Sequence, residues 1–261
     1  MGVLYALILG IVQGLTEFLP ISSSGHLLLI EHIFGITEGN LFFNILLHIA
    51  SLLAVVIIMR KEIVNLLKRP FSKKVGTLLL SCVITVVVVL FLSCVDKFTT
   101  ISYLGFGFFI SAILLLVTHI MANKQKKLSL KSEIGYLDAA IIGVIQGIAT
   151  LPGISRSGST ICTSLLLGNS RKSSANFSFL ISIPIIIGAM VFELIKGDFN
   201  ATINISAISC IIGFVASFVV ALLSIKLMLK VIEKGKWLWF SIYLFILSII
   251  VLLNQYVFMW F

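Results

Sequence analysis

Long uncharged apolar runs recur along the chain and are separated by short polar stretches. A hydrocarbon core about 30 Å thick is crossed by about 20 apolar residues in a helix. Runs of that length occupy residues 41–59, 76–94, 98–121, 173–192, 199–225 and 237–261. The pattern therefore predicts an all-α polytopic membrane protein with about six transmembrane helices.

Two further apolar regions are interrupted by polar residues. In the first, GLTEFLPISSSGH (residues 14–26) places a carboxylate, three serines and a histidine between apolar segments. The second, at residues 139–170, is broken at Pro152-Gly153. The flanking segments are short for a full crossing, and proline with serine and glycine interrupts a continuous helix. Because irregular backbone at membrane depth must be shielded from lipid, each region predicts a re-entrant helical hairpin.

The two interrupted regions align with each other without gaps. Residues 6–26 match residues 139–159, and the identities include Gln13 with Gln146 and the run I-S-x-S-G. Three predicted crossings lie between the two copies, so the second hairpin should enter from the opposite face. We therefore expect two inverted repeats, residues 1–131 and 132–261, each with one hairpin and three spans, in one membrane domain.

The net charge of +9 follows the same pattern. Of the 19 basic residues, sixteen lie in clusters at residues 60–74, 124–131, 171–172 and 226–236, between apolar segments. The intervening turns carry Lys97 and Lys196 together with Asp96 and Asp198. By the positive-inside rule the clusters are cytoplasmic, which places the N-terminus and the first hairpin on the outer side. Topology thus accounts for the charge, and nucleic-acid binding is not expected.

The polar residues of the two turns are candidates for chemistry. Backbone N–H groups and hydroxyls at the start of a helix form an anion site. The first turn adds Glu17 and His26, and the second has Arg156 where the first has Ser23. A guanidinium binds phosphate oxygens in a fork, and charges at bilayer depth are costly, which marks Arg156 and Glu17 as functional candidates. A purely structural ion pair between them is the plainer alternative.

Other polar residues within apolar runs receive structural interpretations. His48 and His119 are expected to be merely hydrogen-bonded between helices. Gln13 and Gln146 could support the turns or bond one helix to another. The four cysteines show no paired spacing, which favours packing over a disulfide or metal site.

The motifs resemble those of a known family. Gln13-x-x-x-Glu17, LPISSSGH (residues 19–26) and PGISRSGST (residues 152–160) are similar to the signatures of the undecaprenyl-diphosphate phosphatases, also called the bacitracin-resistance protein family. The resemblance implies hydrolysis of undecaprenyl diphosphate to the monophosphate and inorganic phosphate, which recycles the lipid carrier of peptidoglycan synthesis. It also implies inverted repeats with re-entrant hairpins, in the bacterial cytoplasmic membrane, and a site that opens to the outer face. Many members have Glu in place of Gln13, so one carboxylate is missing here.

With that resemblance, the residues predict metal-assisted hydrolysis where the turns meet. Arg156 would clamp the terminal phosphate, and Glu17, with Gln13 as a neutral ligand, would hold Mg²⁺ or Ca²⁺. Three nucleophiles remain open: Ser23 with His26 as acid/base, His26 itself, or water activated by either. The expected phosphate-binding groups are Ser22, Ser24, Gly25, Ser155, Ser157, Gly158 and Thr160.

A secondary transporter or a lipid-phosphate flippase is the main alternative, since broken helices in inverted repeats are the general plan of transporters. Transport does not require His26 beside Ser23 and Glu17, which favours the enzyme. A structural scaffold would leave the buried Arg and Glu unexplained. The prenyl tail is expected to lie in lipid between the spans, and a homodimer is compatible with the sequence.

Overall fold

Six long helices dominate the computed structural model, which describes residues 2–34, 41–94, 103–124, 130–196 and 205–258. They are α3 (Leu41–Lys68), α4 (Lys73–Ser93), α5 (Leu104–Lys124), α8 (Arg171–Lys196), α9 (Ala207–Lys234) and α10 (Leu238–Leu253), which a π-helical turn (Asn254–Phe258) extends. All six are long and apolar enough to cross a membrane, which confirms the expected spans. Residues 98–102, 199–204 and 259–261 of those spans, and the expected outer turns with Asp96, Lys97 and Asp198, lie outside the described residues.

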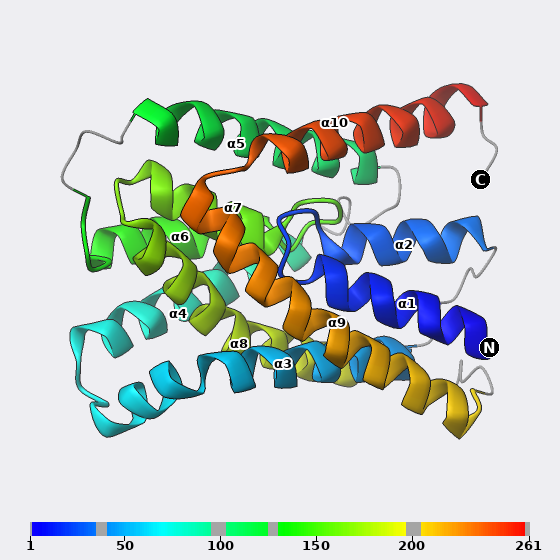
Figure 1. Cartoon of the computed structure of the whole chain (residues 1–261), viewed down its shortest axis with the longest axis horizontal. Coiled ribbons are helices and arrows are strands. Elements are labelled where there is room, and N and C mark those ends of the chain that lie inside the picture. Colours follow the sequence, from blue (N-terminus) through cyan, green and yellow to red (C-terminus); the bar gives the residue numbers. More distant parts are fainter. Residues whose placement is uncertain (1, 35–40, 95–102, 125–129, 197–204, 259–261) are drawn as a thin grey trace.

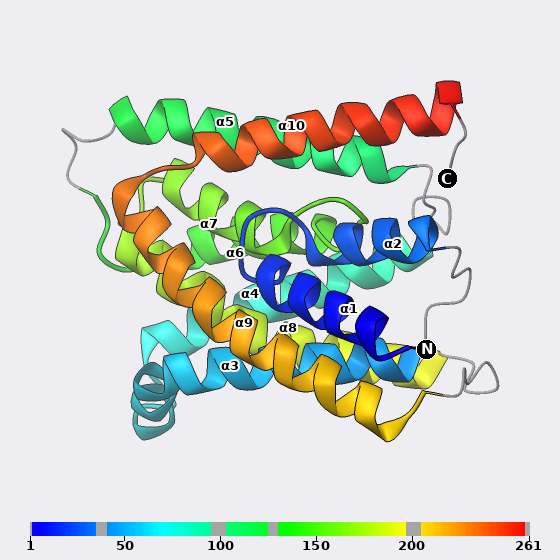
Figure 2. The same cartoon turned by 45° about the vertical axis from the view of Figure 1, so that its right-hand side comes forward.

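Four shorter helices form two hairpins. The first joins α1 (Val3–Thr16) to α2 (Ser23–Ile33), and the second joins α6 (Tyr136–Ile148) to α7 (Arg156–Leu166). The 14 residues of α1 rise only about 21 Å, which is short of a hydrocarbon core. Figures 1 and 2 show the hairpins entering the bundle from opposite ends, with their turns in its interior. The polar interruptions are therefore turns between half-length helices, as the sequence predicts.

Each hairpin packs closely on a distant helix, α1 on α9 and α6 on α4. Glycines permit the approach: a Cβ added at Gly14 would lie 2.4 Å from the carbonyl oxygen of Ser217. A Cβ added at Gly143 would lie 2.6 Å from the carbonyl oxygen of Ser81. Small residues at such positions let helix backbones meet within a membrane. The equivalent helices of the two hairpins thus have equivalent partners, and the division at residue 131 stays a prediction.

Apolar side chains enclose the two turns. Phe18 from the first turn meets Phe179 of α8 edge to face, with ring centroids 6.0 Å apart. Phe108 of α5 belongs to the same core cluster, and α5 runs alongside α10 as a layer beside the turns (Figure 1). Protein therefore shields the irregular backbone from lipid, which is the condition for a turn at membrane depth.

Candidate active site

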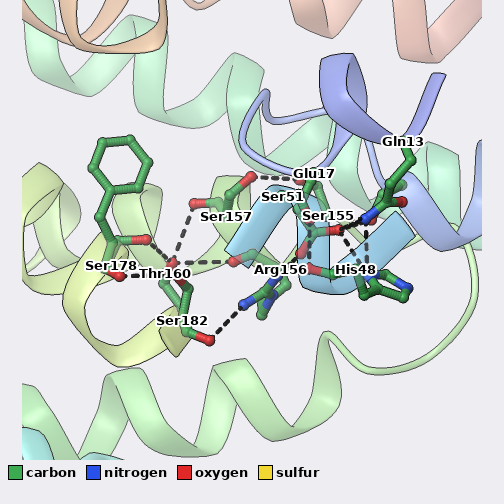
Figure 3. Close-up of polar contacts among 12 residues, drawn as sticks. Gln13, Glu17, His48, Ser51, Ser155, Arg156, Ser157, Thr160, Ser178 and Ser182 are labelled. Carbon is green, nitrogen blue, oxygen red and sulfur yellow. Dashed lines mark hydrogen bonds and ion pairs between the residues drawn. The ribbon is translucent and has the colours of Figure 1, made fainter. Parts of the chain in front are cut away.

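The two turns meet through an ion pair between the hairpins (Figure 3). Arg156, the first residue of α7, donates from Nη2 to Oε1 of Glu17, which follows α1. Ser157 adds a second link by donating from Oγ to the carbonyl oxygen of Leu19, at 2.9 Å. The Glu17 side chain is 2% exposed and the Arg156 side chain 17%. The expected convergence of the guanidinium of one hairpin with the carboxylate of the other is confirmed.

Serine and glycine residues of both turns form helix caps and let the turns pack closely. Ser22 Oγ accepts from the backbone N–H of Gly25 at 3.3 Å, and Ser155 Oγ accepts from that of Gly158 at 3.1 Å. The glycines also let the turns interlock, because a Cβ at Gly25 would lie 3.1 Å from Cα of Gly153 in the opposite turn. These four groups, expected to bind phosphate, are thus engaged in caps and close packing.

His26 stabilises the first turn, and its two ring nitrogens bond to groups other than Ser23. Ser22 has φ 70°, a conformation that strains a residue with a side chain. His26 Nδ1 donates to the carbonyl oxygen of Ser22 at 2.7 Å, so in the neutral ring Nε2 accepts from the hydroxyl of Tyr243 in α10, also at 2.7 Å. Because both ring nitrogens are engaged, the expected Ser23–His26 pair is replaced by other contacts.

Ser23 instead donates to Glu17. Its Oγ lies 2.6 Å from Glu17 Oε2, which also accepts from Gln13 Nε2 at 3.0 Å. The hydroxyl is half-buried at the start of α2 and its proton points at a carboxylate. A hydroxyl paired with a base in this way is the arrangement of an activated nucleophile. The candidate base is therefore Glu17.

Two residues of α3 belong to the site although the sequence did not indicate them. His48 Nδ1 lies 2.8 Å from Gln13 Nε2 and 3.7 Å from Glu17 Oε2, and Ser51 Oγ accepts from Gln13 at 3.3 Å. An amide NH₂ only donates, so Nδ1 of His48 accepts and Nε2 carries the proton of the neutral ring. The expectation that His48 is hydrogen-bonded between helices is confirmed, and its partner, Gln13, places it beside Glu17. The one sequence signal of His48 was an imidazole in an otherwise uncharged span.

A cavity of about 200 Å³ opens beside the ion pair. Its polar wall includes Ser22, Ser23, Ser24, Glu17, His48, Thr150, Ser155 and Arg156, and its other wall includes Ile185, Ile186, Ala189, Met190 and Glu193 of α8. Ser157 and Thr160 line a small hollow on the other side of Glu17 and Arg156, which border both spaces, and Thr160 bonds to Ser178 Oγ. The main cavity thus joins a hydroxyl-rich, charged surface to a face of α8 that is apolar except for Glu193, as an amphiphile with a charged head requires.

The oxygen atoms of the site are too few to hold a metal ion permanently. They suit a cation that binds together with the substrate. Within the described parts of the chain, no group of three or more His, Cys, Asp or Glu side chains could hold a metal. Glu17 is the carboxylate at the ion pair, and Oε1 of Gln13 is buried without a hydrogen-bond partner. Magnesium is commonly held by one or two carboxylates together with substrate phosphates. Glu17 and Gln13 Oε1 meet that requirement only when a diphosphate supplies further oxygens.

Similarity to known proteins agrees with this site. The family model described as bacitracin resistance protein BacA matches residues 6–250, which include both turns. The chain belongs to this family. Three curated relatives of the chain are each named undecaprenyl-diphosphatase. The one from Carboxydothermus hydrogenoformans is 41% identical and covers 96% of both chains. The one from Treponema denticola is 39% identical and covers 94% of both. The one from Bacteroides thetaiotaomicron is 38% identical over 98% of this chain and 100% of its own.

Proposed function

We propose that this chain hydrolyses undecaprenyl diphosphate to undecaprenyl phosphate and inorganic phosphate at the outer face of the bacterial cytoplasmic membrane. The reaction recycles the lipid carrier of peptidoglycan synthesis and confers bacitracin resistance. The observation that carries the proposal is the contact of Ser23 and Arg156, from opposite hairpins, with one carboxylate, Glu17. The names of the relatives supply the substrate, and the apolar wall of α8 suits its prenyl chain.

Substrate binding would exchange the partner of Arg156. In the structure its guanidinium contacts Glu17, and Nη1 donates to the carbonyl oxygen of Ser182 at 3.4 Å. A terminal phosphate carries more charge than a carboxylate and presents oxygens that match the guanidinium fork. Arg156 therefore turns to the phosphate, and Glu17 is left free to take a proton. Arg156 then has two states, one paired with Glu17 and one bound to the terminal phosphate.

The chemical step follows from the Ser23–Glu17 contact. Ser23 Oγ attacks the terminal phosphorus while its proton passes to Glu17, and the bond from that phosphorus to the bridging oxygen breaks. Undecaprenyl phosphate leaves with the bonding electrons. After Glu17 has lost that proton to solvent, water attacks the phosphoserine and Glu17 takes a proton from the water. The bond from phosphorus to Ser23 Oγ breaks, Glu17 returns the proton to that oxygen, and inorganic phosphate departs. A divalent cation, Mg²⁺ or Ca²⁺, held by Glu17 and Gln13 when bound, would supply neutralisation of the diphosphate charge.

The direction in which α8 crosses the membrane supports a cavity that opens to the outer face. This helix begins in a basic cluster at Arg171 and Lys172, and the cavity is lined by its later residues, from Ile185 to Glu193. With the basic end in the cytoplasm, the cavity lies in the half of α8 nearer the outer face.

Phosphate release by detergent-purified protein tests the function. The parent protein should release phosphate from undecaprenyl diphosphate, and from farnesyl diphosphate as a soluble surrogate, and EDTA should suppress release. A monodisperse, helical preparation that releases none with either substrate in the presence of Mg²⁺ or Ca²⁺ would contradict the proposal.

A transporter or flippase is the second candidate, because the hairpins enter from opposite ends and meet in the interior (Figure 2). Reconstituted vesicles separate the two functions. Transbilayer movement of a labelled prenyl phosphate without phosphate release from the diphosphate would favour the transporter.

A further inference from the structure

A cavity of about 800 Å³ lies away from the two turns, at the end of the bundle where α3 finishes and α4 and α8 begin. Five basic residues line it: Lys68, Arg69, Lys73, Lys74 and Lys172. None of its lining residues also lines the cavity of about 200 Å³ beside the Arg156–Glu17 ion pair, here called the catalytic cavity. In Figure 1 this end is opposite to the N-terminus, and the positive-inside rule places it at the cytoplasmic surface. Topology alone requires basic loops but not a hollow between them.

The charge around this cavity is poorly neutralised. Lys74 pairs with Glu62, with Nζ 2.6 Å from Oε2. The other four cations have no ion-pair partner among the described residues, and the lining includes a single acidic residue of the described chain, Glu133. Like charges gathered around a concave surface focus a positive potential into it. The cavity therefore attracts an anion.

Hydrogen-bond donors accompany the charge. The helix α4 starts at Lys73 beside the cavity, and its N-cap residue, Ser72, makes no side-chain cap hydrogen bond. The N–H groups of a first helical turn have no partner within the helix, and here no N-cap side chain supplies one. The hydroxyl residues Ser132, Ser170 and Ser173 also line the cavity. Charge and donors together match a phosphate group.

Apolar surface adjoins the same cavity. Its wall includes Leu66, Ile134 and Phe177. In the turn between α3 and α4, Phe71 is fully exposed and Leu67 is 75% exposed. At a membrane surface such side chains enter the interfacial region beside lipid chains. A ligand with a phosphate and an adjoining acyl chain satisfies both parts of this surface.

We propose that this cavity binds the phosphate-bearing headgroup of an anionic lipid of the cytoplasmic leaflet, as a second anion site separate from the catalytic one. Basic pockets on the cytoplasmic side of membrane proteins bind such headgroups. A soluble phosphate or diphosphate has the same chemistry, and the apolar border favours the lipid. This proposal does not depend on the proposed enzymatic function.

Lipid binding to the full-length protein in a neutral detergent tests the site. Short-chain phosphatidylglycerol is titrated and followed by native mass spectrometry, with phosphatidylcholine of the same chain length as the uncharged comparison. The cavity variant is Lys68→Gln with Arg69→Gln and Lys172→Gln. The control, Lys226→Gln with Lys230→Gln and Lys234→Gln, removes the same charge from α9, whose residues do not line the cavity.

The parent and the α9 control should bind one phosphatidylglycerol at least about 100-fold more tightly than phosphatidylcholine, since five basic residues line the cavity. The cavity variant should bind it roughly 100-fold more weakly, because each basic residue near an anionic lipid contributes about a fivefold factor. It should still release phosphate from farnesyl diphosphate at the parental rate, which separates this test from that of the catalytic function.

Competition identifies the source of the phosphate. Inorganic diphosphate could displace phosphatidylglycerol from the parent and also bind more weakly to the cavity variant. In that case the anion site stands and its ligand is a soluble phosphate. An equal loss in the two triple variants would mean nonspecific charge attraction and would overturn the proposal. Loss of binding in Arg156→Ala would place the lipid in the catalytic cavity and would overturn it as well.

Discussion

The two hairpins share one scaffold and differ in their chemistry. Each second helix is capped by a serine that accepts from the glycine three residues later, and each first helix packs through glycines on an equivalent helix. Where the first hairpin has Glu17, Ser23 and His26, the second has Thr150, Arg156 and Ser159. The carboxylate and the hydroxyl thus lie on one side of the junction and the guanidinium on the other. These three differences between matching positions distinguish the two hairpins chemically.

The paired glutamines show how the surroundings make the difference. Gln13 and Gln146 occupy matching positions and both are buried. The amide of Gln13 reaches Glu17 and, on α3, His48 and Ser51. The amide of Gln146 donates to Thr85 of α4 at 3.0 Å. The same residue type bonds a buried carboxylate in one hairpin and a neighbouring helix in the other.

The largest expected effect on kcat comes from Ser23, whose hydroxyl donates to Glu17 and has no counterpart in the second turn. Ser23→Ala should lower kcat for phosphate release roughly 10⁴-fold or more, since it removes the nucleophile. Ser24→Ala removes the adjacent hydroxyl, which lines the same cavity, makes no bond to Glu17 among the described contacts and could bind phosphate, so kcat should fall at most about tenfold. Trapping of phosphoserine by rapid acid quench and mass spectrometry should place the phosphate on Ser23. A Ser23→Ala protein with parental kcat would assign the attack to water.

Arg156→Lys probes the group that only the second turn supplies. The substitution keeps the charge and loses the fork, so kcat/KM should fall about 10² to 10³-fold. Steady-state kinetics with farnesyl diphosphate measures the loss, and a thermal melt checks that the ion pair to Glu17 is retained. Unchanged kcat/KM would remove Arg156 from the phosphate clamp.

His26→Ala separates support of the strained turn from acid/base catalysis. Without the bond to Ser22, kcat should fall about 10²-fold through misplacement of Ser23. The pH profile of kcat should keep its shape, and His26→Asn should restore part of the rate if its amide can donate to the same carbonyl oxygen. Disappearance of one ionisation from the profile in His26→Ala would instead identify the imidazole as the acid/base.

His48 tests the role of α3 on the catalytic side. His48→Leu should reduce kcat about 10 to 100-fold, because it removes the acceptor that orients the amide of Gln13 beside Glu17. His48→Gln should recover most of the activity, since its carbonyl oxygen can accept from that amide. The matching change on the other hairpin's side, Thr85→Val, should alter thermal stability with kcat within about threefold of the parent. Similar kcat losses in His48→Leu and Thr85→Val would remove the distinction between the two glutamines.

The spans, the hairpins and the contact of Arg156 with Glu17 could be predicted from the sequence. The length of the apolar runs, the proline and glycine interruptions and the internal repeat determine these features. Sequence reasoning could not predict partners that depend on how whole helices rotate. The contact of His26 with Tyr243 joins residues 217 positions apart, and the side of α3 that faces the turns is set by packing. The motif glycines, expected to bind phosphate, are needed where the two turns interlock, which only their relative placement reveals.

The central claim is that Ser23 and Arg156, from opposite hairpins, act on one phosphate in one step. A double-mutant cycle of Ser23→Ala and Arg156→Lys, read as kcat/KM for phosphate release, tests it most directly. The account predicts that the double variant is about as impaired as Ser23→Ala alone, since groups that act as a unit are strongly non-additive. Losses that multiply independently would show that the two hairpins do not form one active site.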